Sequence, residues 1–180
     1  MTLAIAGGLV FFDANTLINF AVIDRLDILG RRYEGCAAWT DGVQFEVKRG
    51  VQSDRRIQRV LDVPWLGSPV EIEGVADLTR VELLRACLSG SSSRPTKHLG
   101  EAQTIFLLET SYESSIFITD DRPAADFARR RGLSVMDSVD VLRECYWKGE
   151  VGCPEAYDLL VEISHQGRGV RVPTHHSDVC

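Results

Sequence analysis

Two short apolar runs, each followed by acidic residues, constrain the fold of this 180-residue chain more than any other feature. The first run covers residues 9–12 and is followed by Asp13; the second covers residues 115–119 and is followed by Asp120 and Asp121. Short runs rich in β-branched and aromatic residues are typical of strands buried on both faces. Because helical patterns occupy most of the sequence between and after them, we predict a mostly parallel α/β sheet covered by helices.

The remaining sequence alternates between helical and strand patterns. Shorter strands are expected at residues 36–39, 70–72 and 133–136. Apolar residues repeating every three to four positions predict helices over about 16–30, 46–61, 75–88, 99–108, 123–131, 138–147 and 154–164. The serine-rich stretch at 89–95 is a loop too short to separate two domains. We therefore predict one domain over residues 1–166 and a C-terminal tail over residues 167–180.

The composition is that of a globular protein, with 44% hydrophobic and 26% charged residues. The net charge of −6 argues against a nucleic-acid partner, because the whole chain would not be attracted to phosphates. Net charge is a sum, however, and binding depends on local patches. The apolar N-terminal run lacks a preceding basic segment, and no stretch reaches the roughly 18–20 apolar residues of a membrane helix. We expect a cytoplasmic protein without membrane contact.

The five cysteines form no C-x-x-C pair, and their number is odd. This pattern is a poor disulfide framework and a poor zinc site. We expect most of them to be small buried hydrophobic residues.

The acidic residues after the two main strands suggest a catalytic site. In parallel sheets, ligands bind beyond the carboxyl ends of the strands, so Asp13, Asp120 and Asp121 should meet at one edge. Glu46 and Glu101 begin predicted helices and can point into the same crevice. Several carboxylates at one place repel each other unless a cation neutralises them, and oxygen ligands favour Mg²⁺ or Mn²⁺. The residues therefore predict a metal-dependent enzyme acting on a phosphate ester.

Four short motifs in register resemble the PIN-domain family of metal-dependent ribonucleases. The resemblance spans about residues 9–147 and depends on the segments 12–18, 99–103 and 118–125, on Glu46, and on Ala128, Arg129 and Gly132. It implies a three-layer α/β/α sandwich with a parallel sheet. It also implies an acidic site that binds Mg²⁺ or Mn²⁺ and hydrolyses RNA.

The resemblance also assigns roles to individual residues. Asp13 matches the first metal ligand, Glu46 and Glu101 match the second and third acids, and Asp121 matches the final acid, with Asp120 as its neighbouring alternative. Asn15 and Thr119 match polar residues that support these ligands. Many members of the family are toxins neutralised by a small antitoxin protein. We accordingly expect an RNA substrate, an antitoxin partner if the chain is a toxin, and a homodimer.

Two basic segments flank these acids and are candidates for contacting the RNA backbone. They contribute Lys48, Arg49, Arg55 and Arg56 beside Glu46, and Arg122 and Arg129 beside Asp121. The four histidines are not expected to take part in catalysis, because three of them lie in or near the predicted tail.

Two alternatives remain open at this point. In a haloacid-dehalogenase-like phosphatase, Asp13 would be the nucleophile. That family needs a second aspartate two residues later, where this chain has Asn15, and a lysine before the late acids, for which Lys97 is available. The second alternative is a degenerate PIN domain that acts as a scaffold or binds RNA without cutting it. Carboxylate-dependent Mn²⁺ binding distinguishes an active site from such a scaffold.

Overall fold

A parallel sheet forms the centre of the protein, for which the computed structural model describes residues 8–89 and 96–180. Its strands within these residues are β1 (Val10–Phe12), β2 (Ala37–Ala38), β3 (Ile116–Ile118) and β4 (Ser134–Met136). They are hydrogen-bonded in the order β2-β1-β3-β4. Every pairing is parallel, and Val10 lies opposite both Ala37 and Ile116. The predicted parallel sheet is confirmed.

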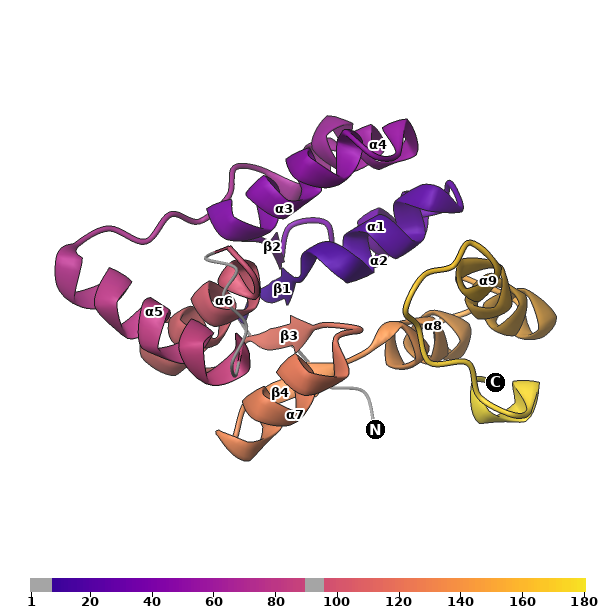
Figure 1. Ribbon diagram of the computed structural model, residues 1–180. Coiled ribbons are helices and arrows are strands. Elements are labelled where there is room, and N and C mark those ends of the chain that lie inside the picture. The colour runs from indigo at the N-terminus through magenta and orange to yellow at the C-terminus, as the bar shows by residue number, and fades with distance from the viewer. Residues whose placement is uncertain (1–7, 90–95) are drawn as a thin grey trace.

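Helices cover both faces of the sheet, as Figure 1 shows with α5 and α6 on one side of the strands and α8 and α9 on the other. One core packs on the face of Phe12 and the other on the face of Phe11. The helices of the first core are α1 (Ala14–Val22), α2 (Leu26–Tyr33), α3 (Asp41–Val51), α4 (Gln58–Asp62), α8 (Ser138–Trp147) and α9 (Cys153–His165). Those of the second are α5 (Val75–Ser89), α6 (Leu99–Thr110) and α7 (Arg122–Arg130). The three-layer α/β/α sandwich is confirmed.

Side-chain alternation explains why the two main strands are apolar throughout. Successive residues of a strand point to opposite faces of the sheet. Phe11 and Phe117 accordingly enter one core, while Phe12 and Ile118 enter the other. All four side chains are fully buried. A strand covered by helices on both sides therefore has no polar face.

Three predicted elements differ from the structure. The helix expected over 16–30 is divided into α1 and α2, because Asp24 adopts a left-handed φ of 58° that no helix can contain. The helix expected over 46–61 is divided into α3, a 3₁₀ turn (η1, Arg55–Ile57) and α4, because Asp54 is extended and accepts a hydrogen bond from the backbone N–H of Arg56. The edge strand expected at 70–72 is reduced to one bridge between Thr40 and Val70.

The segment after α9 packs against the domain. It ends in a 3₁₀ turn (η3, His176–Asp178), and Val179 is 1% exposed. Arg143 of α8 donates to the backbone oxygen of Asp178 at 2.7 Å. Residues 90–95 of the serine-rich loop and residues 1–7 lie outside the described residues. Over the two described stretches, no helix combines the length and apolar character needed to cross a membrane.

The cysteine spacing predicts a poor disulfide framework, but the structure contains a disulfide between Cys153 and Cys180. Cys36, Cys87 and Cys145 are free, and of these Cys145 is buried. Sequence spacing did not indicate the pair, because 27 positions separate the two residues and they meet only when the C-terminal segment folds back onto α9.

Candidate metal centre at the carboxyl edge of the sheet

The sheet itself positions the first acidic residue. The backbone N–H of Asp13 donates to Ile118 at 3.0 Å, and that of Thr119 donates to Met136 at 3.0 Å, so the parallel pairing continues one residue beyond the strands. Along the chain, β1 is followed by β2, which pairs with the edge of β1 that faces away from β3. Strand β3 is followed by β4, which pairs with the edge of β3 that faces away from β1. The edge between β1 and β3 is therefore a topological switch point, where parallel sheets form ligand sites.

Asp13 is buried at this switch point, with 2% of its surface exposed. One carboxylate oxygen accepts the backbone N–H of Thr16 at 2.7 Å and caps α1. The other oxygen accepts the Thr119 hydroxyl at 2.6 Å. Burial and the neighbouring charges of Asp120 and Glu101 raise the pKa of Asp13 well above its ordinary value.

A close crossing of α3 and α6 brings the two glutamates together. A Cβ added to Gly100 would lie 2.7 Å from Cγ2 of Val43, so the helices can approach this closely only because residue 100 is a glycine. The Gln103 side chain fastens the crossing, because its oxygen accepts the backbone N–H of Gly42 at 2.8 Å and its amide donates to Asp41 at 2.9 Å. Glu46 on α3 and Glu101 on α6 consequently face each other.

Glu46 and Glu101 lie in a hollow of about 250 Å³ beside the switch point. The hollow is lined by Asn15, Glu46, Arg49, Thr96, Lys97, His98, Glu101 and Asp121. Oε1 of Glu46 and Oε2 of Glu101 are buried and have no hydrogen-bond partner among residues 8–89 and 96–180. Burial and the charge of Glu101 together raise the pKa of Glu46 to about 7. Two carboxylates that line one hollow, each with an oxygen that lacks a donor, fit a hard divalent cation, which would neutralise their charges.

His98 is a member of this site that the sequence analysis missed. It precedes α6 with a left-handed φ of 60°, and its Nδ1 lies 3.1 Å from Oε1 of Glu101. This hydrogen bond raises the pKa of the imidazole. Ligand atoms of His98, Glu101 and Asp121 lie within 4.8 Å of one another. The signal in the sequence was a histidine three residues before the glutamate that opens a helix.

The two consecutive aspartates after β3 have different surroundings. Asp121 lines the hollow and caps α7 by accepting the backbone N–H of Ala124 at 2.8 Å. Asp120 instead accepts the Asn19 amide at 2.8 Å, and the backbone N–H and hydroxyl of Ser138 at 2.9 and 2.6 Å. The structure thus brings Asp121 together with both glutamates, whereas the carboxylate of Asp120 holds α1 and α8 to the sheet.

Arg168 is a second residue that the sequence analysis missed, because it lies in the predicted tail. Its guanidinium donates to Asn19 at 3.0 Å and to Asn15 at 3.2 Å. Burial lowers the pKa of Arg168, and the charges of Asp13 and Asp120 partly offset this effect. The C-terminal segment therefore delivers a cation to the acidic edge of the sheet.

The six basic residues predicted to contact RNA are divided among four places. Arg49 lines the hollow, and Arg122 and Arg129 line a second hollow of about 420 Å³ that also includes Asp120. Lys48 donates to Gln44 on the outer face of α3, and Arg55 is exposed in η1. Arg56 pairs with Asp54 at 2.7 Å and donates to the Val22 carbonyl at 3.1 Å, so it helps to hold η1 against α1.

A protein-family model described as a PIN domain matches residues 9–176, a stretch that includes the hollow, the switch point and Arg168. No curated protein matches the chain at a significant level.

Proposed function

Because this chain belongs to the PIN-domain family, whose members are generally nucleases, we propose that it is a Mg²⁺- or Mn²⁺-dependent endoribonuclease that hydrolyses RNA phosphodiesters. The observation that carries the proposal is the pair of buried, unpartnered oxygens of Glu46 and Glu101, which share a hollow with Asp121. The net charge of −6 does not oppose this function, because divalent cations would neutralise several of these acids where the RNA binds.

The chain offers a set of oxygen ligands that suits such an ion. Asp13, Glu101 and Asp121 would hold it, with Glu46 as a further acid and Asp120 as the alternative to Asp121. A bound ion would lower the pKa of a coordinated water and neutralise charge that develops on the phosphate. Thr119 fixes the orientation of Asp13 through its 2.6 Å hydrogen bond. The carboxylates that the ion does not engage remain available to accept the proton of the attacking water.

Basic side chains at the hollow supply contacts for the RNA backbone. Arg49 and Lys97 line it together with the acids. Arg168 donates to Asn15, which also lines the hollow, and to Asn19. Cations beside a carboxylate cluster would orient a phosphate toward the metal ligands, because phosphate contacts set the register of a bound nucleic acid.

The direct test uses purified protein freed of metal by a chelator and supplied with Mn²⁺ and labelled single-stranded and hairpin RNA. Cleavage should require Mn²⁺ and should be lost in Glu101→Gln. Glu113→Gln is the matched control, because Glu113 is exposed after α6. Mn²⁺ titration by calorimetry tests the scaffold alternative, since a degenerate domain should show no binding that depends on Glu101. Cleavage by Glu101→Gln at the rate of the control would refute the proposed site.

Two finer parts of the proposal have separate tests. A toxin role requires a small antitoxin, and a short open reading frame beside the gene whose product suppresses growth arrest would support it. A homodimer would elute from a sizing column at twice the 20.0 kDa chain mass. The haloacid-dehalogenase alternative has lost its basis, because the chain belongs to the PIN-domain family.

A further inference from the structure

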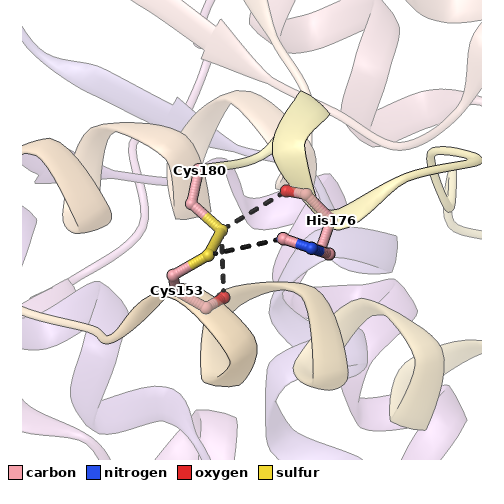
Figure 2. A group of neighbouring side chains, drawn as sticks. All are labelled: Cys153, His176 and Cys180. Carbon is pink, nitrogen blue, oxygen red and sulfur yellow. Dashed lines mark hydrogen bonds between the residues drawn. A yellow bond between two sulfur atoms is a disulfide. The ribbon is translucent and has the colours of Figure 1, made fainter.

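A second cluster of metal-ligand side chains lies away from the acidic hollow, where the C-terminal segment meets α9. Cys153 is the first residue of α9, His176 is the first residue of η3, and Cys180 follows that turn. Figure 2 shows the His176 side chain beside the two sulfur atoms. One ligand atom from each of the three residues lies within 4.8 Å of the other two.

We propose that Cys153, His176 and Cys180, when the two cysteines are reduced, form a Zn²⁺ site distinct from the carboxylate site. The separation of Cys153 Sγ from His176 Nδ1 is 3.6 Å. In a tetrahedral zinc site, bond lengths of about 2.3 Å to sulfur and about 2.0–2.1 Å to nitrogen place these two atoms about 3.6 Å apart. The imidazole and one sulfur thus already have the spacing of two zinc ligands.

The two sulfurs are bonded to each other in the structure, so the site forms after reduction. A dithiol or phosphine reductant supplies two electrons; the S–S bond breaks, each sulfur takes up a proton, and the reductant is oxidised. The backbone oxygens of Cys153 and His176 lie 3.1 and 3.3 Å from Cys180 Sγ, where they can accept its S–H. Zn²⁺ binding then releases both thiol protons.

Zinc geometry also requires the two sulfurs to lie about 3.8 Å apart. The Cα atoms of Cys153 and Cys180 are 5.4 Å apart, a separation that accommodates this distance when one side chain rotates about its Cα–Cβ bond. The sulfur that moves can be that of Cys180, which lies in the segment after η3. The site therefore forms without displacing α9.

The donor set selects a different cation from that of the acidic hollow. Two thiolates and an imidazole favour zinc and similar ions, whereas carboxylates favour Mg²⁺ and Mn²⁺. Cys153 begins a helix of 13 residues, whose N-terminal dipole favours a thiolate. The chain contributes three ligands, and the partial exposure of all three residues leaves the fourth position to water.

A bound ion would fasten the C-terminal segment, because two of its ligands belong to that segment and the third belongs to α9. The same segment carries Arg168 to the acidic edge and Arg171, which pairs with Asp137 at 2.8 Å. Zinc binding to the folded chain should therefore reduce local opening of this segment and raise the melting temperature of the protein.

The test uses Co²⁺ as a spectroscopic substitute for Zn²⁺, with the full chain reduced by a phosphine and with excess Mg²⁺ to occupy carboxylate sites. We expect one Co²⁺ per chain, with a thiolate-to-cobalt charge-transfer band that Zn²⁺ abolishes by competition. Cys153→Ser and Cys180→Ser should lose the band, and His176→Ala should weaken binding by at least about tenfold. Cys87→Ser and His175→Ala, which change an exposed cysteine and an exposed histidine outside the cluster, should bind like the unmodified chain.

Three results would overturn the proposal: a reduced chain without the band, an oxidised chain that binds Co²⁺ equally well, or ligand variants that bind like their controls. Comparison of the oxidised and reduced forms needs no substitution, so the test survives a variant that fails to fold. Ellman titration of the denatured chain verifies that reduction is complete before metal is added. RNA cleavage is not used as a readout, so failure here is independent of the proposed nuclease.

Discussion

Replacing Glu46 by glutamine should stabilise the metal-free protein at alkaline pH. Burial and the charge of Glu101 raise the pKa of Glu46 from 4.5 to about 7. The Glu46 carboxyl therefore loses its proton at a lower pH in the unfolded chain than in the folded chain. The free energy of unfolding consequently falls as the pH rises from about 4.5 to about 7. The difference between the two pKa values corresponds to about 3 kcal/mol, all of which is lost above pH 7.

Glutamine resembles the protonated acid and avoids this loss. Glu46→Gln and the unmodified chain should have equal stability at pH 4. At pH 8.5 the variant should be more stable by about 3 kcal/mol, or roughly 6–12 °C in melting temperature for a chain of this length. Added Mg²⁺ should reduce the difference, because the ion stabilises the ionised glutamates of the unmodified chain.

The assay is urea unfolding followed by circular dichroism at both pH values, with chelator or with Mg²⁺, and Glu113→Gln as the exposed control. A Glu46→Gln variant that is no more stable than the unmodified chain at pH 8.5 would refute the reasoning. So would a stabilisation of the same size at pH 4, because Glu46 is then protonated and its charge no longer opposes folding.

Three further predictions separate catalytic from structural side chains. Asp120→Asn should lower the free energy of unfolding in urea by about 1–3 kcal/mol, because an amide has one oxygen where this carboxylate accepts three donors. Asp121→Asn keeps its helix cap but should lower Mn²⁺ affinity on the order of tenfold in calorimetry. Gly100→Ala should cost about 1–3 kcal/mol and reduce cleavage by spreading α3 from α6, whereas Gly169→Ala, whose added Cβ meets nothing within 4 Å, should change stability by no more than about 0.5 kcal/mol. Arg49→Ala should weaken binding to RNA of any sequence in a filter assay and reduce the salt dependence of log K by about one. Equal stability of the two aspartate variants would contradict the first prediction, and equal effects of the two glycine-to-alanine substitutions would contradict the second. An unchanged salt dependence in Arg49→Ala would contradict the third.

The central layers of the fold were predictable because their signals are local. The apolar runs before Asp13 and Asp120 encode strands buried on both faces, because the strand residues 10–12 and 116–118 are apolar without exception. The helix over 138–147 was also predicted correctly, since its apolar spacing and the acid that precedes it are contained in one short segment. Parallel pairing then places the acids that follow the strands at one edge, whatever the lengths of the connections.

Features that depend on distant packing were not predictable in this way. The break at Asp24 reflects a left-handed backbone conformation between α1 and α2, and the apolar periodicity of the sequence continues through this position. His98 and Arg168 reach the acidic edge only because α6 crosses α3 closely and the C-terminal segment folds back. The disulfide between Cys153 and Cys180 depends on the same return of the chain.

The measurement that tests the central claim most directly compares Mn²⁺-dependent RNA cleavage by the unmodified chain and by Asp13→Asn. Asparagine can still accept the Thr16 N–H and donate to the Thr119 oxygen, so the variant should keep its circular dichroism spectrum and its melting temperature. We expect its cleavage rate to fall by about 10²–10³-fold, the loss typical of removing one group that stabilises the transition state. Undiminished cleavage by a folded Asp13→Asn protein would show that the carboxyl edge of the sheet is not the nuclease site.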